Sequence, residues 1–276
     1  MRFILVIFCL FSVLVWGDET HYFGIGVDTY KDPQMPKTYG AKLDAERVKN
    51  FLQSEAGGGV PEESCYLLKD EKATKKGILN LFKKHSKRIK KCDTLFIFMT
   101  LHGGTSNGLF DDDPEKRFYP YDTDDFDIEK TTFTMREFAC WIFKYIKARR
   151  VIVFIQSCYS GACVEIIAAK NKRYKKEIIA FSSSRSDETS LISNYGGIFG
   201  IALIAGLKGD ADINGDQLVT AEEIAEFVKD KVRAISGSHT PEVYIHKKMR
   251  DYIMADNREI EEEEEEEETD EEEDEE

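Results

Sequence analysis

The sequence predicts an α/β fold, with a mostly parallel sheet covered by helices on both faces. Short apolar runs typical of buried strands alternate along the chain with longer segments in which apolar residues recur at helical spacing. Once a short leader and an acidic tail are set aside, about 240 residues remain, enough for one domain with a sizeable core. Two of the apolar runs also end in residues that could carry chemistry.

Each element is predicted from its local pattern. The segment from Gly40 to Ser54 has apolar residues at helical spacing, and Thr74 to Ile89 reads as an amphipathic helix. A helix is also predicted over Met135 to Ile146. The predicted strands, in chain order, are His21 to Val27, Cys65 to Lys69, Asp93 to Thr100 and Val151 to Ile155.

The two ends of the chain differ from this body. Residues 1–17 combine one early positive charge, Arg2, with an apolar stretch that ends at Gly17, which is typical of a cleaved signal peptide rather than a membrane span. The body is then residues 18–257, and it would be secreted or enter the lumen of the secretory or endolysosomal pathway. We expect residues 258–276 to be a disordered tail, because Glu261 to Glu276 contains 15 acidic residues.

A histidine follows one predicted strand and a cysteine follows the next. His102 comes two residues after the run that ends at Thr100, and Cys158 lies just beyond the run over Val151 to Ile155. The carboxyl ends of neighbouring parallel strands meet at one edge of a sheet, where open α/β folds bind their ligands. The sequence therefore predicts a cysteine–histidine dyad at that edge.

The residue types fit acyl transfer from a peptide bond. A free thiol has a pKa of about 8.5, so a nucleophilic cysteine needs an imidazole to take its proton and later to protonate the leaving amine. Gly103 would let a substrate carbonyl approach the backbone, and its N–H with that of Cys158 could hold the oxyanion. The alternative is an inert core cysteine with a structural histidine.

At these residues the chain resembles a caspase-fold cysteine peptidase of the metacaspase and paracaspase kind. The resemblance runs from about His21 to Tyr244 and includes the segments from Gly40 to Arg47 and from Phe181 to Ser190. His102 precedes Cys158 by 56 residues, as in the caspase arrangement. The resemblance implies a three-layer sandwich around a mostly parallel six-stranded sheet.

The resemblance also indicates substrate-binding positions. Gln156 stands where caspases have a glutamine that helps to form the P1 pocket, while Lys37 and Ile192 stand where caspases have arginines; Ser190 lies close by. Without a guanidinium at Ile192, recognition of a P1 aspartate is weakened. Asp44 matches an acid of metacaspase pockets, which favours a basic P1 residue, or is simply a helix residue paired with a Lys or Arg.

A second motif suggests calcium. Asp212 to Glu223 has EF-hand spacing, although Gln217 replaces the glycine that the left-handed sixth position favours. The alternative is a capping box between Thr220 and Glu223 at the start of a helix. The candidate ligands are Asp212, Asn214, Asp216, Thr220 and Glu223.

Another acidic loop offers a second candidate calcium site. It follows the histidine, and the family resemblance suggests a site near Asp124 and Asp125. The alternative is a solvated loop. No cofactor is required by the predicted chemistry, and Ca²⁺ would be an activator.

Two further segments bear on processing and on cysteine pairing. Cys65, Cys92, Cys140 and Cys163 could form up to two disulfides in an oxidising compartment, or be small buried hydrophobic residues. The basic segment from Lys170 to Lys176 falls where relatives are often cut into two subunits, so an enzyme specific for basic residues could cleave itself there.

Three classes of function are consistent with these residues. The first is a cysteine endopeptidase that acts on peptide or protein substrates. The second is a legumain-like or transamidase-like enzyme specific for asparagine, against which Gln156 counts, and the third is a calcium-binding or interaction protein without activity. Basic residues around His85 lack interleaved aromatics, so nucleic-acid binding is not predicted. The sequence leaves the oligomeric state open.

Overall fold

The computed structural model describes residues 18–109, 115–193, 195–237 and 239–258. The predicted leader, residues 1–17, and the predicted tail from residue 259 onward lie outside these ranges. Within them, no helix combines the length and the apolar character that a membrane crossing requires.

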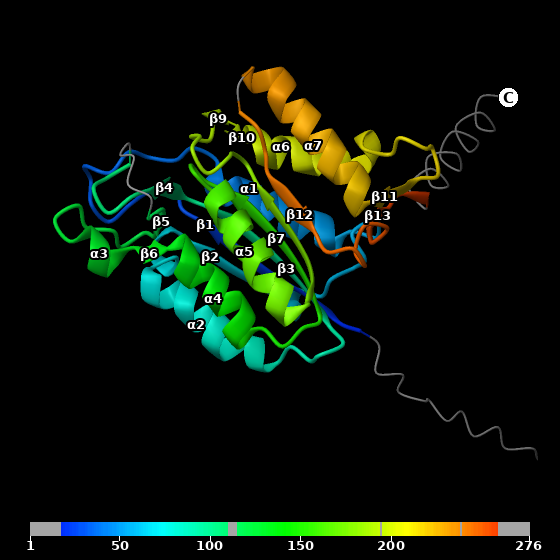
Figure 1. The fold of residues 1–276 in the computed structure, drawn as a ribbon, viewed down its shortest axis with the longest axis horizontal. Coiled ribbons are helices and arrows are strands. Elements are labelled where there is room, and N and C mark those ends of the chain that lie inside the picture. The colour runs from blue at the N-terminus through cyan, green and yellow to red at the C-terminus, as the bar shows by residue number, and fades with distance from the viewer. Residues whose placement is uncertain (1–17, 110–114, 194, 238, 259–276) are drawn as a thin grey trace, which may run out of the picture.

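A six-stranded sheet forms the centre of the molecule (Figure 1), in the order β12-β8-β7-β3-β1-β2. Five strands run parallel, and β12 pairs antiparallel with β8 at one edge. The predicted mostly parallel sheet is confirmed. Its strands are β1 (Thr20–Gly26), β2 (Cys65–Lys69), β3 (Thr94–Thr100), β7 (Arg150–Gln156), β8 (Glu177–Ser182) and β12 (Val243–Ile245).

Helices cover both faces of this sheet, as predicted (Figure 1). On one face lie α2 (Lys75–Lys84), α4 (Met135–Tyr145) and α5 (Gly161–Tyr174). On the other lie α1 (Ala41–Gln53), α6 (Ile198–Ala205) and α7 (Ala221–Ser236). A short helix, α3, spans Ile128–Thr131 outside these two layers. The helix predicted over Thr74 to Ile89 ends earlier than expected, and a 3-10 turn, His85–Lys87, follows it.

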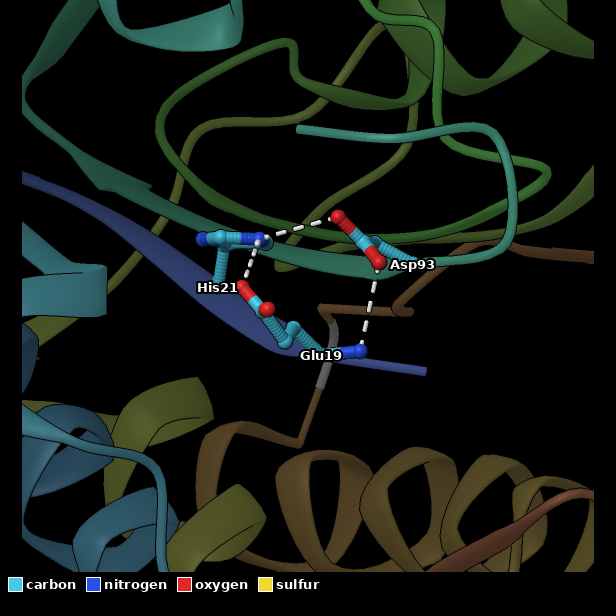
Figure 2. A group of neighbouring side chains, drawn as sticks. All are labelled: Glu19, His21 and Asp93. Atoms are coloured by element: carbon cyan, nitrogen blue, oxygen red, sulfur yellow. Dashed lines mark hydrogen bonds and ion pairs between the residues drawn. The ribbon is translucent and has the colours of Figure 1, made fainter. Parts of the chain in front are cut away.

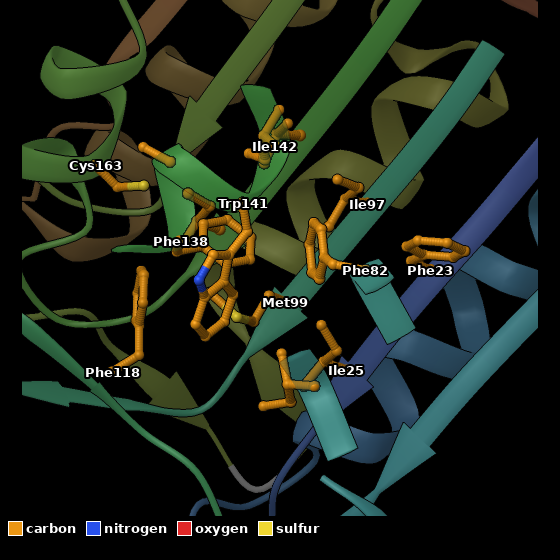
Figure 3. Packing of buried hydrophobic residues seen from close by; sticks show 14 of the residues in the cluster. Phe23, Ile25, Phe82, Ile97, Met99, Phe118, Phe138, Trp141, Ile142 and Cys163 are labelled. Carbon is orange, nitrogen blue, oxygen red and sulfur yellow. The ribbon is translucent and has the colours of Figure 1, made fainter. Parts of the chain in front are cut away.

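Period-two alternation within the strands builds two separate cores. Along β3, Leu95, Ile97 and Met99 point toward the α2, α4 and α5 layer, whereas Phe96 and Phe98 point toward the α1, α6 and α7 layer. Figure 3 shows aromatic residues of the first core packing around Trp141. Strands buried on both faces read as near-continuous apolar runs, which is why the sequence located them.

Smaller sheets extend beyond the central one. Strands β4 (His102–Gly104), β5 (Arg117–Tyr119) and β6 (Phe133–Thr134) form a three-stranded sheet after β3. Strands β9 (Ile192–Ser193) and β10 (Gly196–Gly197) form a hairpin, and β11 (Leu218–Thr220) pairs with β13 (Ile253–Asp256). These strands are only two to four residues long, too short to show a period in the sequence.

Candidate active site

Strand register brings the histidine and the cysteine to one edge of the sheet. Strands β3 and β7 are parallel neighbours, and their last residues, Thr100 and Gln156, are register partners. His102 and Cys158 each follow two residues later. The predicted placement of the two side chains at one carboxyl edge is confirmed by this pairing, and both line a pocket of about 370 Å³.

The Cys158 thiol is held by backbone groups. Its Sγ accepts a hydrogen bond from the Ser190 N–H at 3.2 Å. Burial raises the pKa of the Cys158 thiol, while the Ser190 and Cys158 backbone N–H groups act to lower that pKa. In the resting site the thiol is therefore protonated near neutral pH.

The backbone after the cysteine is strained. Tyr159 has a φ of 60°, a left-handed conformation that costs a non-glycine residue about 1 kcal/mol or more. Its N–H donates to the Glu188 carbonyl oxygen at 2.7 Å, which helps to hold the turn. Strain of this kind gathers at functional sites, and here it turns the chain sharply between β7 and α5.

The imidazole of His102 is oriented through its Nε2 atom. Nε2 lies 2.8 Å from the Pro36 carbonyl oxygen. A carbonyl can only accept, so Nε2 carries the proton and Nδ1 is left as the proton acceptor of the ring. Burial lowers the pKa of His102, partly offset by the Pro36 carbonyl, so the imidazole is neutral at neutral pH.

A tyrosine packs against this histidine. The Tyr30 ring stacks on the His102 ring, with centroids 5.2 Å apart and planes 20° apart. Its hydroxyl accepts from the His102 backbone N–H at 2.9 Å. Sequence reasoning missed both Tyr30 and Pro36, because they lie in the irregular segment between β1 and α1, where no periodicity marks them.

Gly103 lies directly against the backbone of Cys158. A Cβ at this position would come 2.2 Å from the Cys158 carbonyl oxygen, so only glycine fits. The Gly103 and Cys158 backbones are therefore in contact beside the pocket. Their role as oxyanion donors stays a prediction.

The predicted substrate residues divide into two groups. Lys37 and Ser190 line the pocket, together with Ile192. Asp44 and Gln156 are buried, with exposed fractions of 1% and 2%, and neither is among the residues that line it. Asp44 pairs with Arg47, three residues along the same helix, in agreement with the alternative that it is a helix residue with a basic partner.

The EF-hand-like loop adopts a compact turn near β11. The Asp212 carboxylate accepts from the Gly215 and Gln217 N–H groups, and Gln217 has the left-handed φ, 62°, that the motif needs. Asn214 and Asp216 accept from the N–H groups two residues ahead of them. Thr220 and Glu223 form the capping box of α7, as the alternative predicted. Calcium binding here stays a prediction.

The second candidate calcium site lies on the surface. Asp124 and Asp125 are exposed, and the Asp124 carboxylate accepts from the Phe126 N–H at 2.9 Å. Within the described ranges, ligand atoms of three His, Cys, Asp or Glu side chains converge only at Glu19, His21 and Asp93. That cluster lies at the opposite, amino edge of the sheet (Figure 2).

The cysteines and the basic segment have clear structural settings. Cys65, Cys92, Cys140, Cys158 and Cys163 are all free thiols, so the first of the two alternatives, disulfide pairing, is not found among the described residues. Cys163 is wholly buried.

Most of the segment from Lys170 to Lys176 is the last part of α5, and the Lys176 ammonium donates to the Ala148 carbonyl at 2.6 Å. Helical chain does not fit a protease cleft, so the folded state disfavours self-cleavage there.

The comparisons with known proteins support the fold. No family model matches the chain, and no curated protein matches its sequence. Caspase-1 from Spodoptera frugiperda superposes with a TM-score of 0.59 at 12% identity, over 83% of this chain and 87% of that one. Protein GSU0716 from Geobacter sulfurreducens gives 0.56 at 16% identity, over 82% and 92%. The chain has a caspase-like fold.

Proposed function

We propose that this chain is a cysteine endopeptidase in which Cys158 is the nucleophile and His102 is the general base and acid. The observation that carries the proposal is their shared pocket, in which the Pro36 carbonyl fixes the protonated nitrogen of His102. The caspase-like fold supports the same class of enzyme. Fold alone does not establish activity, so the proposal rests on the site.

The resting protonation states define the first step. Because the thiol and the imidazole both start neutral, His102 Nδ1 takes the thiol proton as Sγ attacks the carbonyl carbon of the scissile bond. The resulting oxyanion is received by the Gly103 and Cys158 N–H groups. His102 then gives its proton to the leaving amine, and a thioester remains on Cys158.

Water completes the cycle. His102, neutral again, takes a proton from a water molecule that attacks the thioester carbon. The second tetrahedral intermediate collapses, the acid product leaves, and the Cys158 thiol regains its proton from His102.

The experiment that tests this proposal is cleavage of a peptide library by purified residues 18–258. Cleavage should depend on Cys158 and should stop in Cys158→Ala. A library with varied P1 residues also separates the classes, since strict P1 asparagine cleavage would favour the legumain-like alternative. No cleavage by protein that is folded and carries a reactive thiol would favour a binding protein on this fold.

Entry into the secretory pathway is part of the proposal and rests on residues 1–17 alone. Expression of the full chain in a eukaryotic host, followed by sequencing of the mature amino terminus, tests it. A mature chain that begins near Asp18 is expected, and a chain that retains Met1 in the cytosol would contradict it.

A further inference from the structure

The β9–β10 hairpin forms one wall of the active-site pocket. Ile192 of β9 lines the pocket, and Ser190, just before β9, donates its N–H to the Cys158 thiol. The position of this hairpin therefore sets both the shape of the pocket and the environment of the nucleophile.

Three side chains from other elements hold the hairpin and the start of α6. The Gly197 N–H donates to Asp44 Oδ2 at 2.7 Å, and the Gly200 N–H donates to Gln156 Oε1 at 2.7 Å. From α1, Arg47 donates to the Tyr195 carbonyl oxygen at 2.7 Å. Helix α1 and strand β7 are thereby joined to the hairpin.

The Asp44 and Gln156 side chains that hold the hairpin also form hydrogen bonds with each other and with other side chains. Asp44 Oδ2 also accepts from Gln156 Nε2 at 2.8 Å, and Asp44 Oδ1 accepts from Arg47 at 3.0 Å. Gln156 Nε2 reaches Thr100 Oγ1 at 3.0 Å as well. A carboxylate is an acceptor only, and here three donors are aimed at it.

The hairpin also covers the carboxylate closely. A Cβ on Gly196 would come 2.3 Å from Asp44 Oδ1, and a Cβ on Gly197 would come 2.1 Å from the Gln156 side chain. Asp44 is only 1% exposed beneath it. A cationic substrate side chain could reach Asp44 only by displacing Arg47 and the hairpin.

We propose that Asp44 and Gln156 are positioning residues that anchor the β9–β10 hairpin beside Cys158, with Arg47 as the counter-ion of Asp44, and that neither contacts P1. The inference rests on the proposed peptidase function and narrows its substrate class. Among the described residues, the pocket beside Cys158 is lined by Lys37 and by the apolar residues Leu109 and Ile192, and by no acidic residue. The enzyme therefore disfavours Arg and Lys at P1.

The first measurement is a P1 panel of Arg, Lys, Leu, Asn and Asp substrates with the wild-type chain and Asp44→Asn. Asparagine offers one acceptor oxygen, so at least one of the three donors loses its partner. The expected result is lower kcat/KM for Arg and Lys than for Leu in the wild type, and a loss of about tenfold in Asp44→Asn that is the same for every substrate. Selective loss of Arg and Lys cleavage would overturn the proposal and make Asp44 a P1 contact.

The second measurement does not depend on activity. Amide hydrogen exchange over residues 191–200 should accelerate about tenfold or more in Asp44→Asn, while amides of β3 stay protected. Asp127→Asn, which removes an exposed ion pair with Lys130, is the matched control and should leave both regions unchanged. Unchanged exchange at residues 191–200 in Asp44→Asn would overturn the anchoring role.

A third variant approaches the anchor from the hairpin side. Gly197→Ala forces the hairpin away from Gln156 while the Asp44 charge is kept. It should reproduce the uniform loss and the faster exchange, and it serves if Asp44→Asn does not fold. If the wild type cleaves nothing, the proposed function fails, and the exchange results still decide the anchoring role.

Discussion

The two edges of the central sheet each carry a histidine, and the two histidines differ in their partners and in their access to a pocket. At the amino edge, His21 is buried and its Nε2 lies 3.2 Å from the carboxylate of Asp93, which is wholly buried (Figure 2). At the carboxyl edge, His102 lies in a pocket, and a neutral carbonyl holds one of its nitrogens. His21 and its carboxylate partner are both buried, whereas His102 lines the same pocket as the Cys158 thiol.

The hydrogen bonds that Asp93 accepts from other residues indicate that His21 and Asp93, the amino-edge pair, have a structural role. Burial raises the pKa of Asp93, but the Lys90 and Glu19 backbone N–H groups and His21 more than offset it, so the pKa is lowered. The Asp93 carboxylate thus serves backbone groups of two segments that precede neighbouring strands. The contrast supports the proposal that His102 rather than His21 is catalytic, because His102 lines a pocket with a thiol and His21 is buried against a carboxylate.

The largest expected effect comes from removing either member of the carboxyl-edge pair, His102 and Cys158. Cys158→Ala and His102→Ala should each lower kcat/KM by about 10⁴-fold or more, because they remove the nucleophile or its only base. Rates of peptide cleavage by folded variants measure this. Cys92→Ala removes an exposed thiol and should cleave at the wild-type rate. Retention of more than a hundredth of the activity in Cys158→Ala would move the chemistry elsewhere.

Sequence patterns located His102 and Cys158 because the ends of buried strands can be predicted from the sequence. The apolar runs over Asp93 to Thr100 and Val151 to Ile155 were long enough to be read, and the parallel pairing follows from β-α alternation. Tyr30 and Pro36 could not be found in this way, because their positions depend on a loop folding back over the sheet edge. The role of Asp44 could not be decided either, since its partners Gln156 and Gly197 are 112 and 153 residues away.

A second prediction breaks the amino-edge pair. His21→Ala should lower the free energy of unfolding by about 2 to 3 kcal/mol, because it leaves the buried Asp93 carboxylate without one of its donors and opens a small cavity. Urea unfolding measures this loss. Lys130→Ala removes only an exposed ion pair, which solvent screens, and should leave the urea midpoint unchanged.

Peptide cleavage by His21→Ala tests whether His21 affects stability alone, in contrast to His102. Under conditions where His21→Ala is folded, its kcat/KM should stay within about twofold of the wild type, since no part of the pocket is touched. A loss of activity as large as that of His102→Ala would show that the two edges are coupled.

A third prediction concerns the ring that supports His102. Tyr30→Phe keeps the stacked ring but removes the hydroxyl that accepts from the His102 N–H, and it should lower kcat by about fivefold to tenfold. Tyr30→Leu also removes the stacking and should lose more. Tyr174→Phe, at an exposed tyrosine on α5, is the matched control. Equal activity in Tyr30→Phe and the wild type would limit the role of Tyr30 to packing.

The smallest expected effect is on the pH dependence of kcat/KM and of Cys158 alkylation, which report on His102 and Cys158. Burial lowers the pKa of His102 below its ordinary value of 6.5, so the base stays neutral to lower pH, and the acidic limb of kcat/KM should have its midpoint below 6.5. Burial raises the pKa of Cys158 above 9.0, so alkylation of this thiol in the free protein should accelerate only at alkaline pH. The two neutral groups form no ion pair, and the alkylation profile of His102→Ala should match the wild type. Rapid alkylation near pH 6 that is lost in His102→Ala would show instead a thiolate–imidazolium pair, and the two edges would then differ in charge as well as in access to a pocket.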